Sequence, residues 1–173
     1  TGPPKGVRLS HGALYRSAVL ADRVWAWTET DRLLATASLH TMSGFRNTCL
    51  APLCSGVTVV LVDQAARASP AAVLRTCVRE RVTVLNTVPA FVAAVARVAE
   101  DAGRPTAGPA LRQLLCTGSN LAPEHAIAVE AALGCPVLDY YGLTETAGLC
   151  IAWDSGVHGA ARSGAPVGVG RPV

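Results

Sequence analysis

Short apolar runs alternate with amphipathic stretches along the middle of the chain. The apolar runs have the length of typical strands, about four to eight residues. Several of them are rich in β-branched residues, which is typical of buried strands. They predict strands at residues 32–38, 57–62, 82–86, 111–116 and 136–140. The run at 57–62, VTVVLV, is apolar nearly throughout, so we expect a strand that is covered on both faces.

Helix-like segments separate these strands. Residues 44–53 carry apolar side chains at helical spacing. Ser69 and Pro70 predict a helix that begins with a capping hydroxyl and a first-turn proline and extends to about Arg81. Further helices are predicted at residues 90–101 and 123–133.

This β-α-β-α order predicts an α/β fold with a mostly parallel sheet and helices on both faces. In such sheets, ligands bind beyond the carboxyl ends of the strands. Polar residues follow four of the predicted strands, and we expect them to gather at one edge: His40, Thr87, the run 117–120 and the run 141–145. The Gly- and Pro-rich residues 155–173 predict a loop with at most a short strand.

Composition limits the class of protein. The 173 residues, half of them hydrophobic, suffice for one domain or most of one. The net charge is +3 and the arginines are scattered, so nothing indicates nucleic-acid binding. No apolar run reaches the roughly 18 residues of a membrane span, and no signal peptide opens the chain. The six cysteines form no C-x-x-C pair, which favours buried free thiols in a cytoplasmic protein over a disulfide framework.

The first candidate motif is the Gly/Pro turn at residues 1–6, which holds Lys5, the only lysine of the chain. Glycines let backbone N–H groups approach an anion, and lysine is a compact charge that suits a phosphate. The run lacks the Walker pattern, and because short Gly-rich patterns are common, an ordinary turn explains it equally well when it is taken alone.

The second motif is the run Tyr141 to Glu145. Tyr141 offers a flat face on which a purine can stack, and Gly142 allows close approach of the backbone. Thr144 can donate to a phosphate oxygen, and Glu145 is a hard oxygen ligand for a Mg²⁺ ion that bridges phosphates. The alternative is a turn at a strand end with a solvated glutamate.

Together, T-G-P-P-K-G-V-x-x-S-H at 1–11, Y-G-L-T-E-T at 141–146 and G-x-G-R-P at 168–172 resemble the adenylate-forming, AMP-binding superfamily. This superfamily includes acyl- and aryl-CoA ligases, luciferases and the adenylation domains of peptide synthetases. The order and rough separation of the motifs match. The resemblance also covers His40-x-x-x-Gly44, Val88-Pro89 and residues 117–120, and thus nearly the whole chain.

The resemblance implies a role for each matching residue. At the β- and γ-phosphates of ATP it places Thr1, Gly2, Lys5 and Gly6, and at a phosphate also Thr144. On the two faces of adenine it places Tyr141 and the run Gly118, Ser119 and Asn120. Asp139 would lie near the adenine amino group, with Tyr140 and Gly142 beside these residues. Glu145 would bind Mg²⁺, and His40 would lie beside the acyl carboxylate. The implied catalytic set is therefore His40, Thr144 and Glu145.

The implied reaction is ATP-dependent activation of a small carboxylic acid as acyl-AMP. The acyl group then passes to a thiol, either of CoA or of pantetheine on a carrier protein. Amino-acid-activating domains usually carry an Asp in the segment that corresponds to residues 37–45, and here that segment has no acid, so the chain looks more like the acyl- and aryl-CoA ligases. An amino-acid adenylation domain and a degenerate, noncatalytic nucleotide-binding or scaffolding domain stay open as alternatives.

The resemblance also predicts how the chain fits a larger protein. Residues 1–173 are expected to be an internal segment of the large N-terminal AMP-binding domain. The family's ribose-binding Asp and its small C-terminal domain with a reactive Lys would lie outside this segment, which alone is expected to be inactive. Tyr140 stands where the family often has a small residue, so we expect a narrowed acyl pocket.

Overall fold

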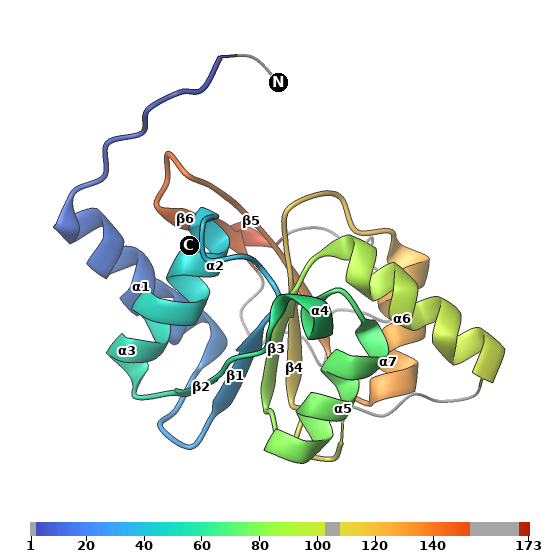
Figure 1. Cartoon of the computed structure of the whole chain (residues 1–173). Helices are drawn as coiled ribbons and strands as arrows, with labels where there is room; N and C mark the ends of the chain where they lie inside the picture. Colours follow the sequence, from blue (N-terminus) through green and yellow to red (C-terminus); the bar gives the residue numbers. More distant parts are fainter. Residues whose placement is uncertain (1–2, 103–107, 153–169) are drawn as a thin grey trace.

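A seven-stranded sheet forms the centre of the protein (Figure 1). The computed structural model describes residues 3–102, 108–152 and 170–173. The strands are β1 (Arg32–Ala35), β2 (Thr58–Val60), β3 (Val84–Thr87), β4 (Gln113–Cys116), β5 (Val137–Leu143), β6 (Gly148–Ala152) and β7 (Arg171–Pro172). Their order is β2-β1-β3-β4-β5-β6-β7; the first five in this order run parallel, and β6 and β7 pair antiparallel.

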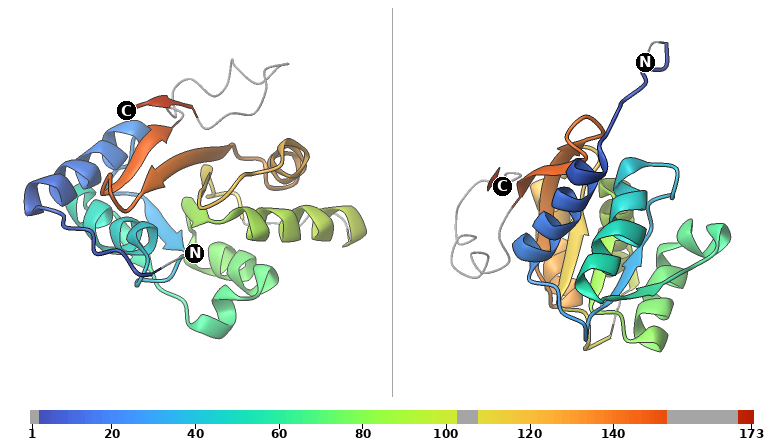
Figure 2. Two further views of the ribbon diagram at one scale, coloured as in Figure 1. Left: turned by 90° about the horizontal axis from the view of Figure 1, so that it is seen from above. Right: turned by 90° about the vertical axis from the view of Figure 1, so that its left-hand side faces the viewer.

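Helices cover both faces of the sheet (Figures 1 and 2). They are α1 (His11–Trp25), α2 (Met42–Phe45), the π-helical turn η1 (Arg46–Leu50), α3 (Ala51–Ser55), α4 (Gln64–Arg67), α5 (Pro70–Glu80), α6 (Pro89–Ala102) and α7 (Pro123–Leu133). Helices α1 and α3 share one apolar core with the sheet, while α5, α6 and α7 share the other. The predicted fold class is confirmed. No helix in the described residues is long and apolar enough to cross a membrane.

Local signals explain several helix positions. The Ser69 hydroxyl accepts a hydrogen bond from the Ala72 N–H at 3.3 Å, and Pro70 occupies the first turn, as predicted for α5. Helix α7 spans the predicted residues, and Gly134 ends it with a left-handed conformation. Helix α1, which was not predicted, is capped in the same way by Ser10, whose hydroxyl accepts from the Ala13 N–H at 3.1 Å.

One prediction about burial was wrong. Strand β2 lies at the edge of the described sheet and pairs only with β1 there. Only one of its three residues, Val60, is buried, so the strand is not covered on both faces. Thr58 is exposed, and Leu61 just beyond the strand is 74% exposed. Strand β1 is also shorter than predicted, because it ends at Ala35.

The hairpin of β5 and β6 extends beyond the parallel strands (Figure 1). Strand β5 was predicted to end at Tyr140, but it continues to Leu143 because β6 pairs with it antiparallel. The pairing shifts register between Tyr141 and Gly142. A Cβ atom on Gly142 would lie 2.0 Å from the carbonyl oxygen of Gly148, so only glycine permits this approach of the two strands.

Candidate active site

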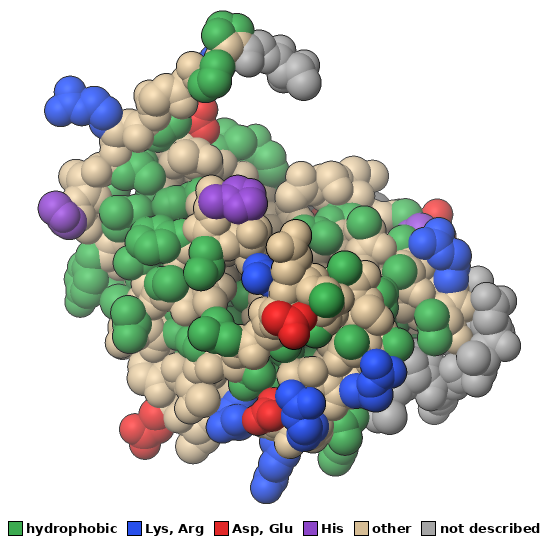
Figure 3. All heavy atoms as spheres, viewed as in Figure 1, with side chains coloured by type: hydrophobic (Ala, Val, Ile, Leu, Met, Phe, Trp, Pro, Cys, Tyr) green, Lys and Arg blue, Asp and Glu red, His purple; other side chains and the backbone are tan. Residues whose placement is uncertain are grey.

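A cleft of about 150 Å³ opens at the carboxyl edge of the parallel strands. Its walls come from the helical segment of α2 and η1, from the end of β4 and from the β5–β6 hairpin. The lining residues are Met42, Ser43, Arg46, Thr117, Tyr140, Gly142, Leu143, Thr144 and Gly148. Figure 3 shows acidic and basic side chains close together at the lower end of the face shown, with others scattered along its upper and right-hand rim. A larger hollow of about 590 Å³ lies between α5 and α6, but its lining is mostly apolar and includes no candidate residue.

Three of the predicted residues line the cleft: Tyr140, Gly142 and Thr144. The Thr117 hydroxyl donates to the carbonyl oxygen of Tyr140 at 2.8 Å and so fixes the end of β4 against β5. The predicted adenine-binding residues Gly118, Ser119 and Asn120 follow directly and are exposed. The structure therefore brings the ends of β4 and β5 to one edge, as predicted.

Tyr140 is a core residue as well as a wall of the cleft. Its side chain is 3% exposed, and its ring packs edge-on against Trp25, with 5.0 Å between ring centroids. The Asn47 and Asn86 amides donate to its hydroxyl oxygen at 2.8 and 3.2 Å. Tyr140 thus occupies part of the cleft wall, and the narrowing of an acyl pocket by this residue stays a prediction.

The second half of the motif is exposed. Tyr141 is 44% exposed, and because side chains alternate along a strand it lies on the other face of β5 from Tyr140. Thr144 and Glu145 lie in the exposed turn between β5 and β6. Thr144 lines the cleft, whereas Tyr141 and Glu145 are exposed beside it and are not among its lining residues.

Short hydrogen bonds fix this turn. The Thr146 hydroxyl lies 3.0 Å from the carbonyl oxygen of Leu143 and 2.7 Å from that of Gly148, so it bridges the two strands. The Ser17 hydroxyl of α1 donates to the Ala147 carbonyl oxygen at 2.7 Å, and Ala147 has a left-handed backbone with φ of 57°. Helix α1 thereby holds the turn from outside the hairpin.

Asp139 is the buried titratable group of this edge. It is 5% exposed, and its Oδ1 atom has no hydrogen-bond partner in the described residues. Burial raises the pKa of this carboxyl to about 6, although the Tyr140 backbone N–H acts in the opposite direction. An unused acceptor suits the role near the adenine amino group that the resemblance implies.

The residues also fit a magnesium ion that is shared with a phosphate. No group of three His, Cys, Asp or Glu side chains gathers anywhere in the described ranges, so the protein there offers no complete metal cage. Glu145 would provide one carboxylate, and phosphate oxygens would provide further ligands, which is how Mg²⁺ is commonly held in nucleotide sites.

The structure does not bring every predicted residue to the cleft. Thr1 and Gly2 lie outside the described residues. Lys5 and Gly6 are exposed on a segment that extends away from the body before α1 (Figures 1 and 2). His40 is exposed in the turn before α2 and is not among the lining residues. The roles implied for these residues stay predictions.

Sequence reasoning missed the polar residues beneath the cleft. Arg46, Asn47 and Asn86 are fully buried, and Asn47 donates to the Asn86 side-chain oxygen at 3.0 Å. A weak signal was present, because Arg46 and Asn47 interrupt the mostly apolar helical segment 44–53. Their burial depends on contacts with β3 and β5, which are distant in sequence.

The family model of AMP-binding enzymes matches residues 1–173. The chain therefore belongs to the AMP-binding enzyme family, and its relatives include acid–CoA ligases. It is 35% identical over 147 residues to a sulfoacetate–CoA ligase of Cupriavidus necator, covering 85% of this chain and 28% of that protein. It is 33% identical over 147 residues to a feruloyl-CoA synthase of Amycolatopsis sp, covering 85% of this chain and 29% of that protein.

Solved structures agree with this assignment. A benzoate CoA ligase from Burkholderia xenovorans LB400 superposes with a TM-score of 0.82 at 29% identity, over 98% of this chain and 33% of that one. An O-succinylbenzoate coenzyme A synthetase from Bacillus subtilis, in complex with ATP and a magnesium ion, gives a TM-score of 0.81 at 28% identity, over 100% of this chain and 34% of that one. The chain spans 28–34% of the length of these four proteins.

Proposed function

We propose that the full-length gene product that carries this chain is an ATP-dependent acid–thiol ligase. It activates a carboxylic acid as acyl-AMP and then transfers the acyl group to a thiol. The observation that carries the proposal is the family match over the whole chain, together with the exposed β5–β6 turn, in which Thr144 lines the cleft and Glu145 follows it.

In the first step, a carboxylate oxygen of the acid attacks the α-phosphorus of ATP, and the bond to the leaving pyrophosphate breaks. Two anions meet, so the site must neutralise charge that develops in the transition state. The Thr144 hydroxyl would donate to a phosphate oxygen. Glu145 would hold Mg²⁺, which supplies positive charge, while Tyr141 would orient the adenine by stacking.

In the second step, a thiolate attacks the acyl carbon and AMP leaves. The relatives' names specify CoA ligases of carboxylic acids, which supports CoA as the acceptor. Pantetheine on a carrier protein has the same thiol chemistry and is the alternative acceptor. The segment 37–45 offers no acid to pair with an α-ammonium, so we expect acids without an α-amine.

The decisive experiment is pyrophosphate exchange by the full-length protein with a library of carboxylic acids, ATP and Mg²⁺. We expect at least one acid without an α-amine to drive exchange. Exchange driven only by proteinogenic amino acids would support an adenylation domain instead, and no exchange with any acid would favour a noncatalytic domain.

The division between acyl and nucleotide sides can be tested with His40→Ala. Because the resemblance assigns His40 to the acyl carboxylate, the substitution should impair use of the acid and leave the affinity for ATP nearly unchanged. A large loss of ATP binding would contradict this assignment.

We also propose a cytoplasmic location. All six cysteines are free, and burial raises the pKa of the Cys77 and Cys135 thiols to about 12, which keeps them protonated. Buried thiols of this kind suit a reducing compartment. Recovery of the native protein in a secreted or periplasmic fraction would contradict the proposal.

A further inference from the structure

Arg46 is a fully buried arginine in the wall of the cleft. It begins the π-helical turn η1, a type of irregularity that is frequent at functional sites. Its side chain is 0% exposed, and yet it belongs to the cleft lining. The guanidinium therefore lies in the wall of the cleft, just beneath its surface.

The positive charge of Arg46 has no counter-ion in the described residues. Of the ion pairs recorded there, none includes Arg46, and its Nη1 and Nη2 atoms have no hydrogen-bond partner. Burial lowers the pKa of the guanidinium, and the electrostatic interaction with the Tyr140 hydroxyl acts in the opposite direction. Arginine is effectively always protonated in proteins. Buried charges are normally paired, so this one calls for an explanation.

Aromatic rings stabilise the face of the Arg46 guanidinium but do not pair with its N–H groups. The guanidinium carbon lies 5.5 Å from the centroid of the Trp25 ring and 5.4 Å from that of Tyr140. Such cation–π contacts act through the faces of the guanidinium or ring, whereas the N–H groups of Nη1 and Nη2 lie in the guanidinium plane. These donors form the flat fork that binds a carboxylate or a sulfonate with two hydrogen bonds.

The surroundings hold the fork in place. The Nε–H of Arg46 donates to the side-chain oxygen of Asn47 at 2.9 Å, and Asn47 in turn donates to Asn86 and Tyr140. A Cβ atom on Gly148 would lie 3.0 Å from Cδ and 3.1 Å from Nη1 of Arg46, so the glycine leaves the space that the arginine fills. The Nε bond leaves the two terminal nitrogens free.

From this geometry we propose that Arg46 binds a second anionic group on the acid substrate, so that the ligase selects short acids with a carboxylate or sulfonate besides the reacting carboxylate. This inference rests on the proposed function, because it places the anion on the acid that the ligase activates. The small volume of the cleft, about 150 Å³ against about 300 Å³ or more for drug-sized ligands, favours a short chain.

The reacting carboxylate is a poorer partner for Arg46. Adenylation converts that carboxylate into a neutral acyl group, which would leave the buried guanidinium unpaired in the product. An ion pair with the attacking oxygen would also stabilise the ground state more than the transition state. A second anion keeps its charge through both steps and so stays paired with Arg46.

The first test compares matched acids with the full-length wild-type protein. Succinate against butyrate and malonate against propionate differ mainly in the second carboxylate, and 3-sulfopropionate supplies a sulfonate. We expect kcat/KM in pyrophosphate exchange to be about 100-fold higher for the dianionic acid of a pair, because a monoacid leaves Arg46 unpaired. Exchange driven equally well or better by the monoacids overturns this inference alone. If no acid drives exchange, the proposed function fails and the inference fails with it.

The second test is Arg46→Met, with Arg46→Lys as the conservative variant. Arg46→Met should raise KM for the dianionic acid by about 100-fold while KM for ATP stays constant, and Arg46→Lys should restore part of the loss. Arg79→Met is the matched control, since Arg79 is exposed beside Glu80 at the other edge of the sheet. A rise in KM for ATP with every acid would assign Arg46 to a phosphate, and an unchanged acid preference would make it structural; either result overturns the inference.

Discussion

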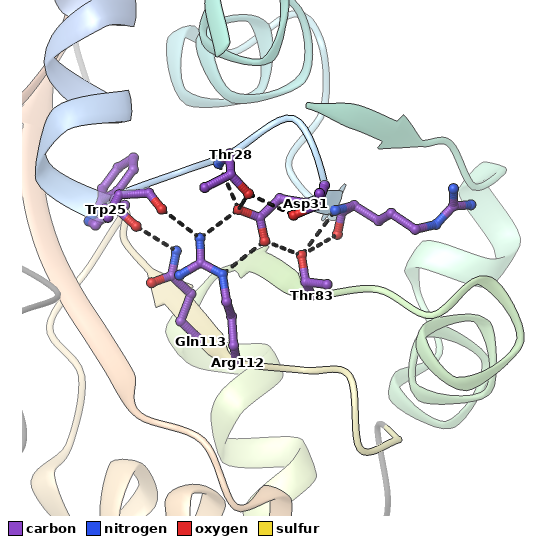
Figure 4. Close-up of polar contacts among 9 residues, drawn as sticks. Trp25, Thr28, Asp31, Thr83, Arg112 and Gln113 are labelled. Atoms are coloured by element: carbon purple, nitrogen blue, oxygen red, sulfur yellow. Dashed lines mark hydrogen bonds and ion pairs between the residues drawn. The ribbon is translucent and has the colours of Figure 1, made fainter. Parts of the chain in front are cut away.

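The amino and carboxyl edges of the parallel strands differ in whether their buried charged side chains are paired. At the amino edge, Asp31 is 4% exposed and accepts hydrogen bonds from Nε and Nη2 of Arg112 at 2.8 and 2.7 Å (Figure 4). The Thr83 hydroxyl and the Thr28 N–H donate to the same carboxylate at 2.6 and 2.9 Å. At the carboxyl edge, Arg46 and Asp139 are just as buried, but each has a polar atom without a partner in the described residues.

The pKa values of the two buried carboxyls follow this difference. Burial alone would raise the pKa of Asp31, but hydrogen bonds from Arg112 and Thr83 outweigh it and lower the pKa below the ordinary value. For Asp139, burial dominates and raises the pKa to about 6. The amino edge therefore stabilises the fold by pairing its charges, whereas the carboxyl edge keeps donors and acceptors free for a ligand.

The largest effect on stability should come from Arg112→Met, because it leaves the Asp31 carboxylate buried without its cation. We expect the free energy of unfolding to fall by about 2–3 kcal/mol at neutral pH, less than for a fully buried pair since the Arg112 side chain is 36% exposed. Urea unfolding of the full-length protein measures this. Arg79→Met removes a surface arginine and should change little, so equal losses in both variants would contradict the comparison.

Asp139→Asn should raise the free energy of unfolding, in contrast to Arg112→Met, and the gain should depend on pH. The folded pKa is raised, so folded Asp139 holds a proton that the unfolded chain releases, and wild-type stability falls as the pH rises from about 4 to about 6. The variant should match the wild type near pH 4 and be more stable by on the order of 2 kcal/mol near pH 8. Thermal unfolding at both pH values measures this; Asp63→Asn, at an exposed helix cap, controls for the lost charge. A variant that is less stable near pH 8 would refute the unpaired state of Asp139.

Glu145→Gln should slow adenylation by at least about tenfold, which corresponds to about 1.4 kcal/mol, because the variant loses the carboxylate that would hold Mg²⁺. Pyrophosphate exchange over a range of Mg²⁺ concentrations measures both the rate and the apparent metal affinity. Glu124→Gln, on the exposed start of α7, is the matched control. Unchanged exchange in Glu145→Gln would remove Glu145 from the metal site.

The smallest effect on stability should come from Arg46→Met. The substitution removes a charge that has no ion-pair partner in the described residues, but it also removes the hydrogen bond to Asn47 and the contacts with the Trp25 and Tyr140 rings. The free energy of unfolding should therefore fall by about 1 kcal/mol, less than for Arg112→Met. Chemical denaturation in parallel with Arg112→Met measures the contrast directly. A loss as large as that of Arg112→Met would mean that Arg46 is a structural residue.

Helices whose signals lie within a few residues could be predicted from the sequence. Helix α5 begins where Ser69 and Pro70 indicate, and α7 has the expected bounds, because caps and helix-terminating glycines act locally. Helix α1 was missed although its signals are present: Ser10 caps it, and its buried residues recur at helical spacing.

Features that depend on neighbours in space could not be predicted in the same way. An apolar run in the sequence predicted the position of β2. The run does not encode the order of the strands, and it is this order that places β2 at an edge of the described sheet. Likewise, Tyr141 to Glu145 was recognised as a nucleotide motif from its own residues. Arg46 resembles any other arginine in the sequence, and only packing against Trp25 and Tyr140 reveals that it is buried and unpaired.

The hydrogen bond from Ser17 to Ala147 makes helix α1 and the hairpin turn one mechanical unit. A bond of 2.7 Å cannot survive a relative shift of more than about an ångström, because hydrogen bonds weaken steeply beyond their normal length. The glycine-rich segment leads directly into α1, and Glu145 lies two residues before Ala147. A displacement of α1 would therefore carry with it the turn that holds Glu145.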